Sequence, residues 1–155
     1  MRNKIGISLF ILYIIQFNLP WKWEWIENLQ SDKIFNEWSG FALFFVILIQ
    51  WIPTFNRAIL GQGGMKKERT LSFHKWVGAL SPIVFYIHTT HPGYALLLFL
   101  TVVFFLNISL GYIYHGQREA GKNRYFNIWI TSHVILSVMV LIISLLHLWI
   151  VFYFD

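Results

Sequence analysis

Long apolar stretches separated by short polar connections dominate the chain. Two of them, Leu80–Tyr114 and Tyr125–Tyr153, contain no Lys, Arg, Asp or Glu. Their apolar residues run continuously instead of alternating, which is typical of membrane helices and not of membrane strands. Because a bilayer core of ~30 Å needs about 20 helical residues, this pattern predicts an all-α integral membrane protein, a bundle of five transmembrane helices. The predicted spans are about residues 5–19, 34–52, 71–90, 94–114 and 127–154.

The basic residues predict the orientation of these spans. With the N-terminus in the cytoplasm, ten of the 12 Lys and Arg residues lie on the cytoplasmic side, and only Lys22 and Lys33 lie outside. Such a positive-inside bias is typical of membrane proteins. We therefore expect a cytoplasmic N-terminus, an outer C-terminus and residence in a bacterial inner membrane, in contact with lipid. The net charge of +5 then reflects topology and gives no reason to expect nucleic acid as a partner.

Composition restricts the chemistry of the chain. Hydrophobic residues make up 57% of the sequence and charged residues only 12%, so we expect residues 1–155 to form a single transmembrane domain. There is no cysteine, which excludes disulfides, thiolate catalysis, iron–sulfur clusters and thioether-linked haem supplied by this chain. We find no arrangement of residues typical of a hydrolase or of a phosphate-binding loop.

Histidines provide the main candidate site. His74 and His88 are fourteen residues apart, and His133 and His147 repeat that spacing. Fourteen helical residues turn through about 1400°, about 40° short of four turns, and rise ~21 Å, so each pair shares one helix face. The third and fifth predicted spans run in the same direction. This predicts an inner b-type haem held by His74 and His133 and an outer one held by His88 and His147.

Nearby residues are consistent with this interpretation, and alternatives remain. Gly78 and Ser137, each four residues after a histidine, would leave space for a flat macrocycle, although small residues also promote helix packing. The histidines could instead hydrogen-bond neighbouring helices or bind chlorophyll, whose magnesium usually takes one protein ligand. Four further residues are weaker candidates for cofactor contacts: the propionate partners Arg57 and Arg69, His91 near the outer haem or a quinone, and His115 near an inner propionate or a quinone.

Residues 71–154 resemble the ferric reductase-like transmembrane superfamily, which includes ferric reductases, NADPH oxidases and the haem subunit of a methionine-sulfoxide repair system. The resemblance is carried by Phe73-His74-Lys75, Ile87-His88-Thr89, Ser132-His133-Val134 and Leu146-His147-Leu148. It implies two stacked haems that pass electrons from the cytoplasmic to the outer side. The b cytochrome of quinol:cytochrome c oxidoreductases uses the same ligand spacing, but its Pro-Glu-Trp-Tyr motif is absent from this sequence.

Family members typically have six spans, and many carry a flavin and nicotinamide domain that this sequence does not show. We therefore expect a di-haem b-type cytochrome that acts as an electron-transfer oxidoreductase subunit without a catalytic domain of its own. Its donor would be another redox protein or a membrane quinol. The alternatives are a haem-containing membrane anchor or quinone-interacting subunit without net transmembrane transfer, and a pigment-binding membrane protein.

Overall fold

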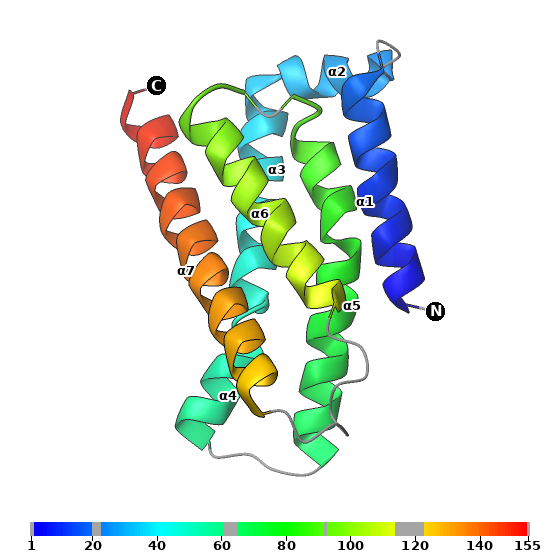
Figure 1. The fold of residues 1–155 in the computed structure, drawn as a ribbon. Helices are drawn as coiled ribbons and strands as arrows, with labels where there is room; N and C mark the ends of the chain where they lie inside the picture. Colours follow the sequence, from blue (N-terminus) through cyan, green and yellow to red (C-terminus); the bar gives the residue numbers. More distant parts are fainter. Residues whose placement is uncertain (1, 20–22, 61–64, 92, 114–122, 155) are drawn as a thin grey trace. The chain divides into compact units, whose positions relative to one another are not determined.

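The computed structural model describes residues 2–19, 23–60, 65–91, 93–113 and 123–154, and within these ranges every regular element is an α-helix (Figure 1). The all-helical class predicted from the sequence is therefore confirmed for this part of the chain. By contact clustering the chain divides into two compact units, Met1–His91 and Pro92–Asp155. The helices are α1 (Arg2–Asn18), α2 (Glu24–Ser31), α3 (Lys33–Ile49), α4 (Ile52–Leu60), α5 (Met65–His88), α6 (Leu96–Ile113) and α7 (Asn123–Phe154).

The prediction of a bundle of five transmembrane helices is wrong. Among the described residues, only Lys33–Asn56 and Arg124–Phe154 are both long and apolar enough to cross a membrane. The apolar helical stretches Lys4–Asn18 and Leu96–Tyr112 have at most 17 residues. At ~1.5 Å per residue such helices fall short of a ~30 Å bilayer core.

Helix α5 also does not qualify as a membrane-crossing helix, because of its charge and not its length. It has 24 residues, which is long enough, but its first half is rich in charged residues. Its longest uncharged stretch is residues 76–88, which contains Pro82 and His88. The apolar pattern that predicted a span at residues 71–90 is therefore too short and too polar to define a membrane helix. The charged residues are Lys66, Lys67, Glu68, Arg69 and Lys75.

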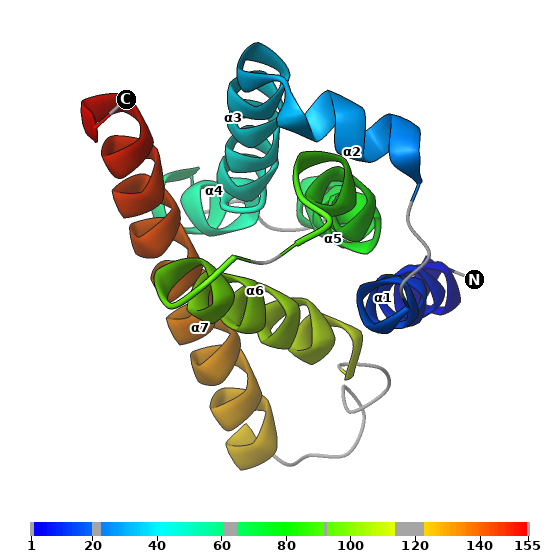
Figure 2. The ribbon, with the colours of Figure 1, turned by 90° about the horizontal axis from the view of Figure 1, so that it is seen from above.

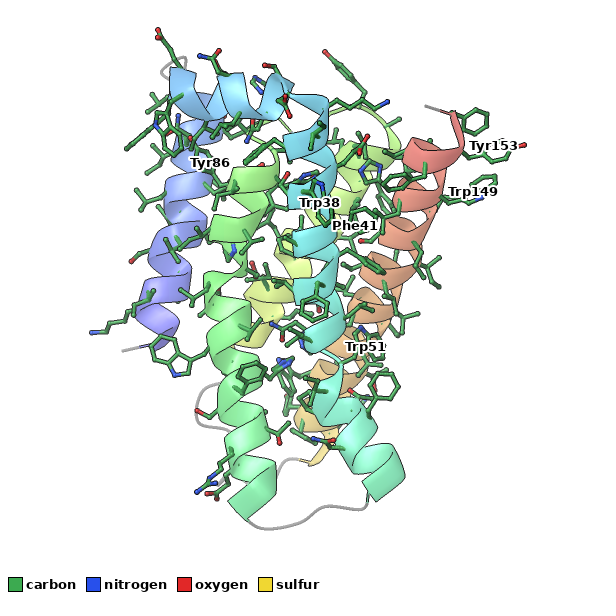
Figure 3. All side chains as sticks on the ribbon, turned by 180° about the vertical axis from the view of Figure 1, so that it is seen from behind. Trp38, Phe41, Trp51, Tyr86, Trp149 and Tyr153 are labelled. Carbon is green, nitrogen blue, oxygen red and sulfur yellow. The ribbon has the colours of Figure 1, made fainter. Side chains whose placement is uncertain are left out.

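The two long helices support association of the chain with a membrane. In each, only 11% of the most apolar window is buried, unlike the core helix of a soluble domain. Large aromatic side chains project from α7 near its C-terminal end, where Figure 3 shows Trp149 and Tyr153. Their rings stack with centroids 5.2 Å apart, and both side chains are exposed. Exposed Trp and Tyr near helix ends are typical of membrane–water interfaces.

In the first unit, α5 is the central helix. It contacts α1, α2, α3 and α4, and Figure 2 shows it between α1 and α3. Tyr13 of α1 packs edge-on against Phe85 of α5, with ring centroids 5.4 Å apart. Both residues are buried. Since each buried aromatic ring removes a large apolar area from solvent, this contact is a main part of the α1–α5 interface.

A proline interrupts α5 midway between its two histidines. Pro82 is fully buried and has no N–H to donate to the carbonyl four residues earlier, which belongs to Gly78. The preceding hydroxyl replaces that donor, because Ser81 Oγ donates to the Gly78 carbonyl at 2.8 Å. A neighbouring Ser or Thr often satisfies the backbone group that a helix proline leaves open.

The short helix α2 is tied to the end of α5 by one side chain. Gln30 Nε2 donates to the carbonyls of Tyr86 at 2.9 Å and Ile87 at 3.1 Å. Gln30 Oε1 accepts from the Thr90 N–H at 3.2 Å and from its hydroxyl at 2.8 Å. The last carbonyls of a helix lack intrahelical partners, so Gln30 caps α5 directly beside His88.

The second unit is a helix pair. Asn107 Nδ2 of α6 donates to Ser137 Oγ of α7 at 3.0 Å, and Trp129 Nε1 donates to the Leu110 carbonyl at 2.8 Å. Partners advance along α6 while they recede along α7, so the two helices are antiparallel. Gly93 precedes α6 with φ +65°, and a Cβ there would lie 2.8 Å from the Leu97 side chain, so this turn requires glycine.

Candidate metal-ligating histidines

The two predicted histidine pairs lie on different units. His74 and His88 are on α5 in the first unit, and His133 and His147 are on α7 in the second. All four side chains are half-buried. The structure thus brings the members of each pair onto one helix, as the spacing predicts. The pairing of His74 with His133 and of His88 with His147 stays a prediction.

The imidazole of His74 is oriented by Gln50, which follows α3. Its Nδ1 lies 3.0 Å from the Gln50 backbone carbonyl. Since a carbonyl can only accept, this contact requires the proton on Nδ1 and puts the lone pair on Nε2, the nitrogen that would face a metal. Metal-ligating histidines are commonly oriented in this way.

The side-chain amide of Gln50 touches the same turn of α5. In the orientation that satisfies both of its polar atoms, its oxygen accepts from the Gly78 N–H at 2.7 Å and its nitrogen lies 2.6 Å from His74 Nδ1. That second contact would favour the opposite tautomer, with the proton on Nε2. We assign the proton to Nδ1, because the backbone carbonyl is a fixed acceptor whereas the amide can rotate.

His88 contacts the other end of α3. Its Nδ1 lies 3.1 Å from Ser39 Oγ, and Ser39 Oγ donates its own proton to the Asn36 carbonyl at 3.0 Å. The hydroxyl therefore accepts from His88 Nδ1–H, which again puts the lone pair on Nε2. The ring also packs on a glycine, because a Cβ at Gly40 would lie 3.0 Å from His88 Cε1.

His133 has a different environment. Its ring stacks on Trp129, with centroids 5.8 Å apart and planes at 4°. The Trp129 indole is in turn held by its hydrogen bond to the Leu110 carbonyl. A glycine of α6 also approaches this imidazole, since a Cβ at Gly111 would lie 3.7 Å from His133 Cε1. Stacking and close packing thus set the plane of this ring.

Neighbouring helices occupy the two small-residue positions that were predicted to leave space for a macrocycle. A Cβ at Gly78 would meet the Gln50 amide at 3.5 Å. Ser137 is bonded to Asn107 of α6 and also donates to the His133 carbonyl at 2.8 Å. Both positions therefore serve helix packing within their own units. This was the alternative interpretation of small residues in membrane helices.

The weaker candidates are spread along the chain. His91 is exposed in the turn after α5, where its Nδ1 lies 3.1 Å from Thr90 Oγ1. Arg69 is exposed on the first half of α5. His115 and the side chain of Arg57 lie outside the part of the chain that is described. The structure does not bring His91 and Arg69 together, since they lie at opposite ends of α5.

The sequence interpretation missed Trp129 and Gly111 beside His133, and it missed Ser39, Gly40 and Gln50 in the first unit. The last three belong to α3 or its C-terminal end, which carries no histidine and no repeated spacing. The available signal was weak, because Ser39 and Gln50 are two of the few polar residues in the stretch predicted as the second span. Polar side chains in such a stretch tend to have a specific partner.

The imidazoles of His74 and His88 suit the axial ligation of an iron porphyrin in their chemistry. In the described residues, no group of three or more His, Cys, Asp or Glu side chains could hold a metal ion. A porphyrin brings its own equatorial ligands, so a haem requires only axial imidazoles. The Nδ1 contacts of His74 and His88 fit that requirement, because they would leave Nε2 as the ligating nitrogen.

The chain matches no protein family model, no curated protein and no solved structure. The resemblance to the ferric reductase-like superfamily therefore stays a prediction based on the histidine motifs.

Proposed function

We propose that this chain is a di-haem b-type cytochrome that passes electrons across a membrane. The observation that carries the proposal is the fourteen-residue spacing of His74 and His88, repeated by His133 and His147 on a second helix. Structural hydrogen bonding alone gives no reason for two helices to share one spacing. Two haems held between the helices require it, because each level needs one imidazole from each helix.

The environment of the α5 histidines supports the proposal. Their Nδ1 atoms lie against acceptors on α3, the Gln50 carbonyl and Ser39 Oγ, so each imidazole would present Nε2 to iron. A hydrogen bond at Nδ1 also raises the basicity of the ligating nitrogen. The rise of ~21 Å between the two histidines of one helix would separate two haem levels.

A haem with two imidazole ligands supplies one-electron chemistry, as the iron changes between its ferric and ferrous states. The chain's contribution is to hold the imidazoles at two levels, to exclude water and to set the basicity of the ligands. Electron transfer needs no general acid or base. We propose that the donor is another redox protein or a quinol, that the chain is a subunit of a larger complex, and that it resides in a bacterial inner membrane.

The test is single-ligand substitution in the full chain, purified in mild detergent after expression with ample haem. We expect two haems per chain by the pyridine haemochrome assay. His74→Ala and His133→Ala should each lose the same haem, identified by its midpoint potential, and His88→Ala and His147→Ala should lose the other. Thr131→Ala, at an exposed position of α7 two residues before His133, is the control and should retain both.

A colourless wild-type chain would refute the proposal. Loss of the same haem in His74→Ala and His147→Ala would show that the pairing is incorrect, because those residues would then share a level. An absorption spectrum typical of chlorophyll in place of haem would identify the chain as a pigment-binding protein. Reduction of the loaded protein from one side of a vesicle should reach both haems, whereas a haem-containing anchor would leave one of them oxidised.

A further inference from the structure

We infer that Ser39 and Gly40 of α3 are positioning residues for His88, and that they set the orientation and basicity of this imidazole as an iron ligand. The inference rests on the proposed function and extends it to a helix without histidines. The two residues are adjacent, and both contact the His88 ring: Ser39 through a hydrogen bond to Nδ1 and Gly40 through close packing at Cε1.

The hydrogen bond determines which nitrogen of His88 carries the proton. Ser39 Oγ donates to the Asn36 carbonyl at 3.0 Å, so its lone pairs face the ring, and Nδ1 at 3.1 Å must be the donor. A bond from Nδ1–H to an acceptor makes Nε2 more electron-rich. A more basic axial ligand stabilises the ferric state, so this bond should lower the midpoint potential of the haem that His88 holds.

The glycine determines where the ring can lie. A Cβ at Gly40 would be 3.0 Å from His88 Cε1, which is too close without movement of the imidazole. The comparable glycine in the second unit has more space, since a Cβ at Gly111 would be 3.7 Å from His133 Cε1, an ordinary van der Waals distance. The chain therefore contains a matched pair of glycines beside histidines, of which only Gly40 restricts its neighbour tightly.

The same helix also contacts the other histidine of α5 near its C-terminal end, where the carbonyl of Gln50 accepts from His74 Nδ1–H. The order of the partners, Ser39 with His88 and Gln50 with His74, makes α3 antiparallel to α5. One helix thus provides an Nδ1 acceptor for each histidine of its neighbour. Ser39 is the acceptor that can be removed by substitution, because the Gln50 acceptor is main chain.

The first experiment measures both midpoint potentials of the haem-loaded full chain. Ser39→Ala should raise the potential of the haem that is lost in His88→Ala and leave the other unchanged. Ser39→Thr keeps a hydroxyl and should restore the wild-type value. Ser109→Ala is the matched control, because this hydroxyl donates to its own helix at Phe105 O, 2.8 Å away, and has no histidine partner; both potentials should be unchanged.

The second experiment compares the two glycines. Gly40→Ala should shift the electron paramagnetic resonance signal of the His88 haem or cause its loss, whereas Gly111→Ala should keep both haems with unchanged signals. Circular dichroism shows whether each variant is folded. If Gly40→Ala does not fold, the Ser39 variants still test the inference.

The outcomes separate the inference from the proposed function. If the wild type binds two haems but Ser39→Ala leaves both potentials unchanged, or shifts only the haem that His88 does not hold, the inference is wrong and the proposed function stands. The same conclusion follows if Ser39→Thr behaves like Ser39→Ala, because the effect would then not come from the hydroxyl. If the wild type binds no haem, both fail.

Discussion

The helices α5 and α7 carry the same histidine spacing in very different surroundings. Helix α5 is contacted by four other helices of its unit, is interrupted by Pro82 and has both imidazoles bonded to acceptors from α3. Helix α7 has 32 residues without a proline and, within its unit, packs on α6. The comparison teaches that the same histidine spacing can occur on a helix contacted by several neighbours and on a helix that, within its unit, packs on one.

The largest change in the free energy of unfolding should come from substitution of Gln30, which caps the end of α5. Gln30→Leu removes the bonds to the Tyr86 and Ile87 carbonyls and to Thr90. At about 1 kcal/mol for each neutral hydrogen bond, and with part of the site exposed, we expect the free energy of unfolding to fall by about 2 kcal/mol. Unfolding in mixed micelles and amide exchange at Thr90 measure this.

The control for Gln30→Leu is Asn28→Leu, which replaces an exposed amide on the same short helix. It should change the free energy of unfolding by less than about 0.5 kcal/mol. Equal effects of the two substitutions on the free energy of unfolding would mean that α2 does not stabilise the end of α5 through Gln30.

The next largest change in the free energy of unfolding should come from substitution of Ser81, which precedes the proline of α5. Ser81→Ala removes the hydroxyl that satisfies the Gly78 carbonyl in a part-buried hydrogen bond, so we expect the free energy of unfolding to fall by about 1 kcal/mol, the low end of the cost of an acceptor left without a donor. Ser144→Ala, at a buried serine of α7, should cost less, because no proline interrupts the hydrogen bonds of that helix. Equilibrium unfolding of the two variants compares the helices directly.

A double substitution sharpens this result. Pro82→Ala gives the backbone an N–H that can donate to the Gly78 carbonyl, so Ser81→Ala should cost less in that background than alone. If the two substitutions change the free energy of unfolding additively, Ser81 does not replace the missing proline N–H. The proline would then no longer account for a difference in stability between α5 and α7.

A smaller effect is expected in the second unit. Asn107→Leu removes the hydrogen bond to Ser137, while Ser137 keeps its bond to the His133 carbonyl. A neutral hydrogen bond contributes about 0.5–1.5 kcal/mol, and this one is part-buried, so we expect the free energy of unfolding to fall by about 0.6 kcal/mol. A loss larger than that of Gln30→Leu would reverse the comparison, because α7 would then be the helix that depends more on a side-chain contact.

The smallest effect should come from Gln50→Leu. This change removes the side-chain amide but keeps the backbone carbonyl that accepts from His74 Nδ1–H. Under the proposed function, we expect both haems to remain and their midpoint potentials to change less than in Ser39→Ala. Loss of the haem assigned to His74, seen in the absorption spectrum, would show that the amide and not the carbonyl orients His74.

The sequence by itself determined that the chain is helical and that each histidine pair shares a helix face. Both follow from local periodicity, since 3.6 residues per turn places residues fourteen apart in line. It also located the two helices long enough to cross a membrane. It overestimated the number of spans, because apolar stretches around α1, α5 and α6 were counted without the lengths of the folded helices and the charged first half of α5.

Only the tertiary structure decided which residues surround the histidines. Ser39 is 49 residues from His88 and Gln50 is 24 residues from His74, and their meeting depends on the antiparallel packing of α3 on α5. The contacts of Gln50 with Gly78 and of Asn107 with Ser137 likewise depend on packing. Such contacts leave no local pattern, because any of several polar residues on a neighbouring helix could meet the same position.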